Sequence, residues 1–376
     1  MIRLLMGITL SECGGSQRVV YDIAANLPES LYDVTVMTSP GGELLDWINE
    51  LNKTRKNEIK VITARCFKRK ISIFYDIAAF FFVLKTLLKI KPDIAHFHNS
   101  KMGVIGRLAG KIAGVPNVYY TVHGWGLNRK TAGRLYGAMS LLERGVSRLS
   151  TQIVFVSGSD RETGIQNQWA SASASRLIYN GIAESRAGSA HLRKELGIPD
   201  GIPVIVFVAR LCEPKDPMFA IRVSACLAGS GMEHRLLVIG DGPKRRECER
   251  LVGELGMGGR VLMLGHRDDV RALLMEVDIF CLFTKWEGLP ISVIEAMFAG
   301  LPVVANAVGG IPEIVEHGKT GFLIEEFNIQ KAADLLASFV KEKSLRLAMG
   351  DAGRAAALSK FSLGGMVDGY RRLYES

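Results

Sequence analysis

The chain has 376 residues, of which 48% are apolar and 23% are charged, and this composition excludes a disordered, fibrous or coiled-coil protein. At about 100–200 residues per domain, the length indicates two domains. The net charge of +9 is unevenly distributed: residues 1–180 contain 23 Lys and Arg against 13 Asp and Glu, whereas residues 181–376 contain 24 against 25. A basic N-terminal half favours an anionic partner, such as nucleic acid, a membrane surface or a phosphorylated substrate.

The cysteines and the apolar runs exclude further classes of protein. Six cysteines are spread along the chain without a C-x-x-C pair, which argues against a disulfide framework or a zinc site. Residues 1–15 lack a small-residue cleavage site, so we interpret them as a first buried strand rather than a signal peptide. The longest apolar run, 77–84, is far shorter than the roughly 20 residues that span a bilayer. We therefore expect a cytoplasmic protein that is soluble or peripheral to a membrane.

Short β-branched strands alternate with amphipathic helices from end to end. In the first half the expected strands are 2–9, 32–38, 59–63, 93–97, 117–122 and 151–156. In the second half they are 203–209, 235–240, 260–264, 277–283, 301–305 and 321–324. Nearly continuous apolar strands separated by helices indicate parallel sheets covered on both faces. We expect two doubly wound α/β domains, 1–182 and 203–360, joined by a polar linker, 183–202, with ligands at the carboxyl ends of the strands in the cleft between the domains.

The most informative segment is FTKWEGLPISVIEAMFAGLPVVA, residues 283–305. It predicts the end of a strand, a loop with Glu287 and Gly288, and a helix that begins near Pro290. Glu295 then lies one to two turns into that helix, so the two carboxylates have different environments and need not share a role. An arbitrary pair of glutamates at this spacing is usually solvated surface, but the strand, loop, proline and helix together favour a functional site.

A second segment, VFVARLCEPKDPMFA, places Arg210 at the end of a strand and Lys215 five residues on. Asp216 is expected to cap the following helix, with Pro217 as its first residue. Two cations beside a helix N-terminus can bind a diphosphate, although the same pair could equally be solvated surface. A third segment, VIGDGPKRRE, contains a Gly-x-Gly turn, which is weak evidence because tight turns need glycine anyway.

The N-terminal half contains a glycine pair and three histidines at expected strand ends. Gly14 and Gly15 precede an amphipathic helix, where they either admit a ligand phosphate or only form a tight turn. His96 and His98 form an H-x-H pair, but no further ligand cluster is evident, so we expect no metal. His123 is followed by Gly-Trp-Gly and is expected to face the cleft.

Two nucleotide-binding motifs are incomplete. HGKTG resembles the end of a phosphate-binding loop, but Glu313 occupies the position of its first glycine. The full G-x-G-x-x-G fingerprint is also absent after the first strand, and no Asp-x-Asp occurs that could hold a nucleotide sugar through a divalent metal. Neither nucleotide hydrolysis nor simple dehydrogenation has its signature here.

Six segments, in order over about 203–325, resemble the retaining glycosyltransferases of family four, which have the GT-B fold. They are VARLCEPKD, VIGDGP, LGHRDDV, the E-x7-E stretch EGLPISVIEAMFAGLPVVA, GGIPEIV and HGKTGFL. The N-terminal half matches more loosely, through GGSQRVVYDIAANL, DIAHFH, YTVHGWG, FVSGSD and YNGI. The resemblance implies two Rossmann-like domains that face each other across a deep cleft, with a C-terminal helix, 361–376, that crosses back to the first domain.

The resemblance also implies roles for particular residues. Arg210 and Lys215 would hold the donor diphosphate, and Glu287 would face the transferred sugar. Glu295 would accept hydrogen bonds from the ribose hydroxyls, and His123 matches the family's active-site histidine on the acceptor side. Backbone amides are expected to cradle phosphate and sugar at Gly288, Leu289, Gly14 and Gly15. One departure is Asp216, where the family usually has glycine.

The implied activity is metal-independent, retaining transfer of a hexose-type sugar from a nucleotide sugar to a lipid-linked or membrane-proximal saccharide, in surface polysaccharide or glycolipid biosynthesis. The expected donor is a UDP-sugar, and no cofactor is expected. Two alternatives stay open: a nucleotide-sugar epimerase on the same fold, and a non-enzymatic basic protein that binds membrane or nucleic acid. Nucleic-acid binding ranks last because stacking aromatics are sparse around the basic cluster.

The positive charge is concentrated in residues 53–70, which contain eight Lys and Arg and a single acid, Glu58. The aromatic run 80–82 follows closely. The segment is either a solvated loop beside a buried helix or, in a transferase, an edge that docks on an anionic leaflet. We therefore expect residues 53–91 to contact an anionic membrane surface, and the protein to be peripheral at the inner face of the cell membrane.

Overall fold

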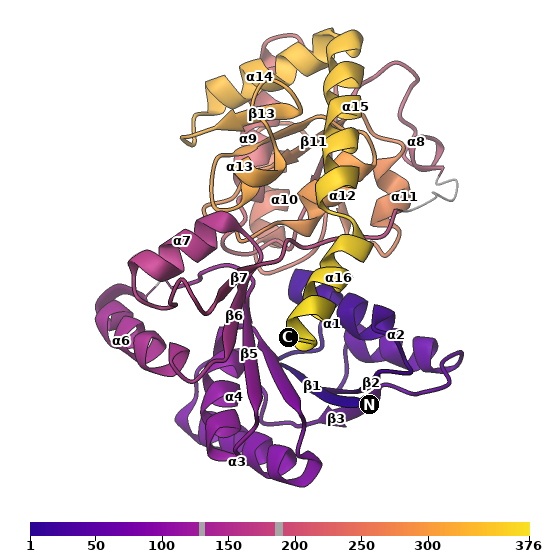
Figure 1. The fold of residues 1–376 in the computed structure, drawn as a ribbon. Coiled ribbons are helices and arrows are strands. Elements are labelled where there is room, and N and C mark those ends of the chain that lie inside the picture. Colours follow the sequence, from indigo (N-terminus) through magenta and orange to yellow (C-terminus); the bar gives the residue numbers. More distant parts are fainter. Residues whose placement is uncertain (128–131, 185–190) are drawn as a thin grey trace. The chain divides into compact units, whose positions relative to one another are not determined.

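The computed structural model describes residues 1–127, 132–184 and 191–376. It divides into two compact units (Figure 1). Unit 1 comprises Met1–Gly181 and Leu363–Ser376, and unit 2 comprises Ile182–Ser362. Each unit contains one parallel sheet with helices packed on it, so the expected doubly wound α/β architecture is confirmed.

The sheet of unit 1 has the strand order β3-β2-β1-β4-β5-β6-β7, and all its pairs are parallel. The strands are β1 (Ile2–Ile8), β2 (Tyr32–Thr38), β3 (Lys60–Thr63), β4 (Ile94–His98), β5 (Asn117–Val122), β6 (Gln152–Phe155) and β7 (Ser175–Leu177). The first six confirm the predicted strands to within one or two residues at each end. The sequence patterns missed β7, a polar edge strand of three residues.

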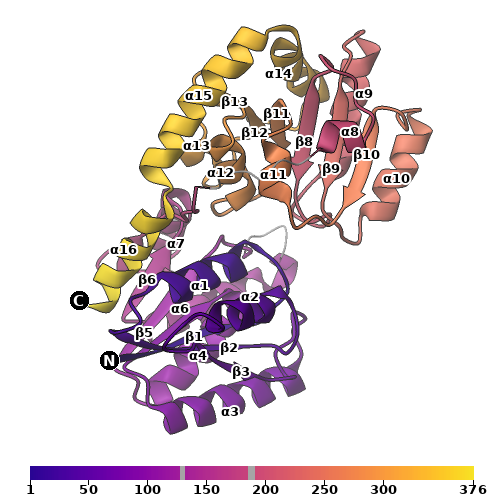
Figure 2. The same cartoon turned by 90° about the vertical axis from the view of Figure 1, so that its right-hand side faces the viewer.

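Helices cover both faces of this sheet. Those described are α1 (Gly15–Asn26), α2 (Glu43–Asn52), α3 (Ile73–Ile90), α4 (Ser100–Ile112), η1 (Gly133–Leu135), α6 (Tyr136–Ser147), α7 (Gly158–Gln166) and α16 (Leu363–Tyr374). Helix α1 packs against α2 and α16, whereas α3 packs against α4, and the two groups lie on opposite sides of the sheet (Figures 1 and 2). The last helix of the chain is thus part of unit 1.

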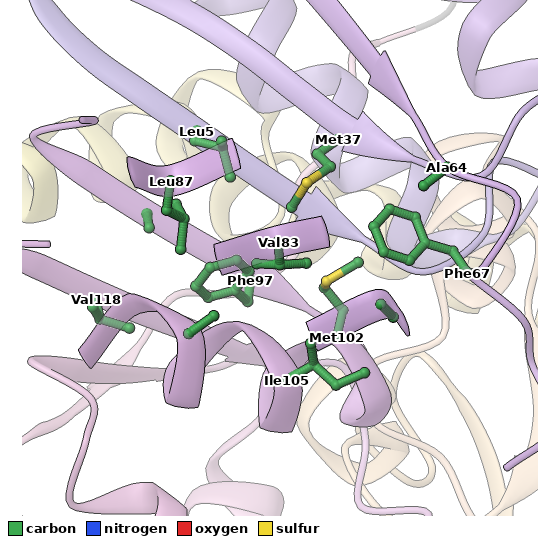
Figure 3. Close-up of a cluster of buried hydrophobic side chains, with 13 residues drawn as sticks. Leu5, Met37, Ala64, Phe67, Val83, Leu87, Phe97, Met102, Ile105 and Val118 are labelled. Atoms are coloured by element: carbon green, nitrogen blue, oxygen red, sulfur yellow. The ribbon is translucent and has the colours of Figure 1, made fainter. Parts of the chain in front are cut away.

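A buried apolar cluster joins the sheet of unit 1 to α3 and α4 (Figure 3). Phe97 from β4 is fully buried among side chains such as Val83 of α3 and Met102 of α4. Helix α4 approaches the sheet closely because it carries glycine at the contact: a Cβ at Gly106 would lie 2.3 Å from the Phe97 ring. Each large side chain buried here contributes roughly 1.5–3 kcal/mol.

Unit 2 contains a six-stranded parallel sheet with the order β10-β9-β8-β11-β12-β13. The strands are β8 (Val204–Val208), β9 (Arg235–Ile239), β10 (Val261–Gly265), β11 (Ile279–Leu282), β12 (Val303–Asn306) and β13 (Gly321–Ile324). All six were predicted from their apolar runs. The chain passes from β8 outwards to β10 and then returns to the other side of β8, so the strand order reverses between β8 and β11.

The helices of unit 2 form two groups. They are α8 (Leu192–Glu195), α9 (Pro217–Gly229), α10 (Arg245–Glu254), α11 (Val270–Leu274), α12 (Ile291–Phe298), α13 (Ile311–Ile314), α14 (Ile329–Lys341) and α15 (Lys343–Lys360). Helix α9 packs against α10 and α14, whereas α12 packs against α11 and α15.

The segment 183–202, expected to be a linker, is assigned to unit 2. Residues 185–190 of this segment lie outside the described residues. Helix α8 lies within it, with Leu192 buried and Arg193 paired to Asp278 at 2.6 Å.

Candidate active site

The reversal of strand order in unit 2 brings two loops together. The loop after β8 (209–216) and the loop after β11 (283–290) both leave the carboxyl ends of neighbouring strands. Ligands of open α/β sheets bind at such a switch point, because the two connecting helices turn away to opposite faces and leave room between the loops. The candidate binding and catalytic residues of unit 2, apart from Glu295, lie in these two loops.

Backbone hydrogen bonds join the two loops. The amide of Asp216 donates to the carbonyl of Phe283 at 2.9 Å, and the amide of Lys285 donates to the carbonyl of Pro214 at 3.0 Å. The carboxylate of Asp216 accepts from the amide of Phe219 at 3.0 Å and so caps α9, as predicted. The departure from the family's glycine therefore supplies a helix cap.

Lys215 and Glu287, which are 72 positions apart, form an ion pair in which Nζ donates to Oε1. Their side chains are only 17% and 11% exposed, so solvent screens the pair less than it screens a surface salt bridge. The structure thus brings together one cation and one carboxylate that the sequence had assigned to separate motifs. The pair fixes the Lys215 ammonium beside the carboxylate.

A second cluster adjoins this pair. The Glu213 carboxylate accepts from Lys244 Nζ at 2.7 Å and from Lys285 Nζ at 2.9 Å, and these bonds lower its pKa. The sequence motifs had not indicated Lys244; the only available signal was its place just after the Gly-x-Gly turn. Arg210 is exposed, and its guanidinium has no ion pair or hydrogen bond within the described part of the chain. The two loops carry three cations and three carboxylates, the turn after β9 adds Lys244, and Arg210 is open to a ligand.

Glycine is needed at the turn after β9 because this turn is pressed against the Arg210 loop. Gly240 has φ 127°, and a Cβ there would lie 2.0 Å from the carbonyl oxygen of Ala209. A Cβ at Gly242 would lie 2.5 Å from the carbonyl oxygen of Leu211. The Gly-x-Gly turn thus supports the backbone that carries Arg210.

The Glu287 loop is supported in a similar way by the loop after β12. Gly309 has φ 55°, and a Cβ there would lie 1.9 Å from the carbonyl oxygen of Glu287. The amide of Gly310 donates to the carbonyl of Gly288 at 2.8 Å. The backbone around Glu287 is therefore held by the β8 loop on one side and by the β12 loop on the other.

Helix α12 begins directly after this loop, with Pro290 at its N-cap position and buried Leu289 just before it. Glu295 lies in α12, where its Oε1 accepts from Arg271 Nε at 2.9 Å. The two side chains line a pocket together with residues 182, 183, 275, 298 and 299. Glu287 and Glu295 are thus bound to different cations, which confirms that their environments differ.

Gly14 and Gly15 lie in unit 1, at the start of α1. Gly14 is the N-cap residue and, as a glycine, makes no side-chain cap. Just before it, the amide of Cys13 donates to Glu43 Oε2 at 2.7 Å. The loop therefore already binds one carboxylate oxygen through a backbone amide.

His123 also lies in unit 1, immediately after β5, and its Nε2 lies 3.0 Å from His98 Nδ1. Burial lowers the pKa of His123 to about 4 and that of His96 to about 3, so both rings are neutral at pH 7. The two nitrogens of His96 are bonded to Tyr374 at 2.6 Å and to Thr121 at 2.7 Å. The H-x-H pair is thus part of a hydrogen-bonded core, and no metal-binding group of three or more His, Cys, Asp or Glu side chains occurs among the residues described.

Two family models match the chain. Residues 13–186 match the model described as Glycosyltransferase Family 4, and residues 189–356 match the model described as Glycosyl transferases group 1. The first match covers most of unit 1, and the second covers most of unit 2.

Two curated relatives match along nearly the whole chain. The Escherichia coli UDP-Gal:alpha-D-GlcNAc-diphosphoundecaprenol alpha-1,3-galactosyltransferase is 27% identical over 96% of this chain and 93% of its own length. The capsular polysaccharide biosynthesis glycosyltransferase CapM of Staphylococcus aureus is 27% identical over 88% of this chain and 86% of its own length.

The fold also matches solved structures. Anabaena Alr3699/HepE, in complex with UDP and glucose, has a TM-score of 0.84 at 20% identity and covers 100% of both chains. WaaG, a glycosyltransferase involved in lipopolysaccharide biosynthesis, has a TM-score of 0.77 at 19% identity, over 100% of this chain and 99% of its own. The GT-B fold class expected from the sequence is confirmed by these likenesses.

Proposed function

The chain belongs to the glycosyltransferases that these two family models describe, and we propose that it transfers a hexose-type sugar from a nucleotide sugar to a lipid-linked saccharide without a metal ion. The observation that carries this proposal is the set of basic residues at the switch point of unit 2, where exposed Arg210 and the Lys215–Glu287 pair lie on two joined loops.

The chemistry fits these residues. Cleavage of a sugar–phosphate bond develops negative charge on the departing diphosphate and positive, oxocarbenium-like character on the sugar. Arg210 and Lys215 supply fixed positive charge for the diphosphate, a role that a divalent metal fills in other enzymes. Glu287 supplies negative charge beside the sugar. Arrival of the diphosphate gives Lys215 a second anionic partner.

The remaining residues of unit 2 take supporting roles in the proposal. Glu295, held by Arg271, accepts hydrogen bonds from the ribose hydroxyls of the donor. The amides at Gly288 and Leu289 lie just ahead of α12, where the helix dipole favours a phosphate. We further propose that configuration is retained at the transferred carbon.

Unit 1 supplies residues toward the acceptor in this proposal. His123, neutral at pH 7, contacts the substrate through a ring nitrogen, and the Gly14–Gly15 loop approaches the phosphate and sugar. The relatives support a UDP-sugar as donor and a saccharide linked to a polyprenyl diphosphate as acceptor, because the E. coli relative is named for both. Synthesis of a surface polysaccharide or glycolipid is the corresponding biological process, as the name of the S. aureus relative indicates for that protein.

The test is a transfer assay with a panel of UDP-sugars and a short-chain polyprenyl diphosphate saccharide, in the presence of a chelator. We expect transfer by the unmodified protein and its loss in Glu287→Gln. Glu316→Gln is the matched control, because Glu316 is also paired with a lysine, Lys319, but on the surface at 64% side-chain exposure. Full transfer by Glu287→Gln, or turnover of the donor to an epimer without acceptor, would contradict the proposal.

We also propose that α3 docks unit 1 on an anionic membrane. One face of this helix, with Ala79, Val83 and Leu87, is buried against the core. The opposite face is apolar but exposed: Phe74 is 87% exposed and Phe81 is 61% exposed. Ile77 and Leu88 extend the same face at helical spacing and are also exposed, and we call these four residues the α3 apolar stripe. An exposed apolar stripe on a helix is typical of membrane or protein contact.

Cations flank the α3 apolar stripe. Half of the eight cations in 53–70 are paired with carboxylates, namely Lys53, Arg55, Lys60 and Arg69. The free charge within the described structure is therefore nearer α3, at residues such as Lys68, Lys85 and Lys89. Each basic residue near an anionic leaflet contributes about 1 kcal/mol. Among the described residues, no helix is both long and apolar enough to cross a bilayer.

Vesicle sedimentation tests this docking, with phosphatidylcholine vesicles that either contain or lack phosphatidylglycerol. We expect binding to anionic vesicles only, and at least tenfold weaker binding by a Phe74→Ser/Phe81→Ser variant. Leu347→Ser is the control, since Leu347 is an exposed apolar residue of unit 2 at 56% exposure. Equal binding by the double variant and the control would contradict the role of the α3 apolar stripe. Binding at the inner face of the cell membrane is the corresponding location.

A further inference from the structure

Three histidine rings form a continuous stack in unit 1. The ring centroids of His96 and His98 are 4.2 Å apart, and those of His98 and His123 are 5.3 Å apart with nearly parallel planes at 28°. His96 and His98 alternate with Phe97 along β4 and so face the same side of the sheet, while His123 follows the neighbouring strand β5. The stack therefore ends at the one histidine that the proposed function places against substrate.

His98 lies in the middle of the stack and is completely buried, with 0% exposure. Its Nδ1 bonds to His123 Nε2 at 3.0 Å, and its Nε2 has no hydrogen-bond partner in the described structure. A buried polar atom without a partner costs about 1–3 kcal/mol, so a core that served packing alone would favour an apolar side chain at this position. The bond to His123 is the one polar contact that the described structure gives the His98 ring.

The bond constrains which nitrogen of His123 carries its proton. Both rings are neutral, so one of the two bonded nitrogens donates and the other accepts. If His123 donated, the Nε2 of His98 would be a buried N–H without an acceptor. If His98 donates, its Nε2 carries only a lone pair that accepts from no donor. Among buried backbone groups, an N–H without an acceptor is rarer than a carbonyl oxygen without a donor. The same preference, applied to the two nitrogens of His98, favours His98 as the donor.

We propose that His98 is a positioning residue whose Nδ1–H donates to Nε2 of His123, so that His123 carries its own proton on Nδ1 and presents an N–H donor to a substrate oxygen. This inference rests on the proposed function, in which His123 contacts substrate. Without the bond, both tautomers of His123 become accessible, and only one of them can donate from Nδ1.

The surroundings hold His98 in place for this role. Its neighbour His96 is tied by Tyr374 of α16 on one nitrogen and by Thr121 of β5 on the other. Tyr370 of α16 lies 3.3 Å from the same Thr121 hydroxyl. His98 stacks between this fixed ring and His123, so its ring has little freedom to rotate and the bond to His123 keeps its direction.

Two substitutions at His98 keep a polar side-chain amide but place it differently, so they test whether the position of the hydrogen-bond donor matters. In His98→Asn the side-chain amide lies where Nδ1 was and can still donate to His123, whereas in His98→Gln it lies nearer the former Nε2. His234→Asn is the control for loss of a buried histidine, because His234 is buried in unit 2 and bonded to Ser224 at 2.7 Å. Thermal unfolding checks that each variant is folded.

The experiment combines nitrogen-15 NMR of the histidine rings with transfer kinetics on the full chain. We expect Nδ1 protonation of His123 in the unmodified protein and in His98→Asn, and a mixture of tautomers in His98→Gln. We expect kcat to fall about 10-fold to 100-fold in His98→Gln at unchanged donor KM. Loss of a group that hydrogen-bonds to a metal-binding histidine has an effect of this size in other proteins. In His98→Asn and His234→Asn, kcat should stay within about threefold of its normal value.

Protonation of His123 on Nε2 in the unmodified protein would overturn the inference, as would an unchanged His123 tautomer in His98→Gln. Because the NMR measurement needs no substrate, it decides the role of His98 even if no transfer is observed. Absence of transfer by the unmodified protein would instead contradict the proposed function. The two failures are therefore distinguishable.

Discussion

Gly309 offers a test of how strictly the Glu287 loop must be placed. A Cβ added at Gly309 would lie 1.9 Å from the carbonyl oxygen of Glu287 and 2.8 Å from its carbonyl carbon. To reach the 3.4 Å at which ordinary contacts begin, the two atoms must separate by about 1.5 Å, and misplacement of a reacting group by 1 Å can cost about 100-fold in rate. We therefore predict that Gly309→Ala lowers kcat for sugar transfer by about 100-fold or more.

Gly318→Ala is the matched control for this substitution. Both glycines have left-handed backbone, with φ 55° and φ 79°, but a Cβ at Gly318 would meet nothing within 4 Å. Alanine in this conformation costs roughly 1–2 kcal/mol at either site, and the close contact adds a further loss of stability in Gly309→Ala, so urea unfolding checks that both variants are folded. Transfer by Gly318→Ala should stay close to normal. If Gly309→Ala, folded, transferred sugar as fast as Gly318→Ala, the proposed placement of Glu287 in the reaction would be wrong.

Two further predictions concern stability. Asp216→Ala removes the cap of α9, a carboxylate bonded to the Phe219 amide at 3.0 Å, and should lower the free energy of unfolding by about 1 kcal/mol; an unchanged urea midpoint would contradict the cap. Burial lowers the pKa values of His96, His98 and His123 below their ordinary value of 6.5, so below that pH the unfolded chain binds protons that the folded chain does not. Their contribution to stability should be fully present above pH 6.5 and should decline towards pH 4. A urea midpoint that rose as the pH was lowered from 7 to 5 would refute this.

The strands could be predicted almost completely, because strands buried on both faces are continuous apolar runs whatever their partners are. Edge strand β7 could not, since its three residues, Ser175–Leu177, contain too few side chains for a pattern. Helix α3 shows a second limit. Its apolar run suggested a helix beside the core, yet only the structure shows that one apolar face is buried while Phe74 and Phe81 on the other are exposed.

The sequence could predict which residues of the site lie at the ends of strands, but it could not predict which of these residues contact one another. Arg210, Lys215 and Glu287 could be located by motif and by position after a strand. The pairing of Lys215 with Glu287 depends on the reversal of strand order, which places β8 beside β11 across many intervening residues. Glu213 and Lys244 were missed for the same reason, because each acquires its role only from a partner on another loop.

The histidines illustrate the ambiguity of a short motif. The H-x-H pattern indicates only that His96 and His98 share one face of a strand, which suits a metal site or a hydrogen-bonded core equally well. The decisive partners, Tyr374 and His123, come from elements far away in the sequence. Spacing along a single strand does not contain that information.

In the proposed function, the loops after β8 and β11 of unit 2 bind a nucleotide sugar, on which Glu287 acts. The most direct measurement is transfer of sugar from labelled UDP-sugars to a polyprenyl diphosphate saccharide, with chelator present, by the unmodified protein and by Glu287→Gln. We predict that the unmodified protein transfers sugar at the same rate with and without chelator, and that Glu287→Gln, folded and still able to bind UDP, does not. Transfer that required a divalent metal, or that survived in Glu287→Gln, would contradict the account.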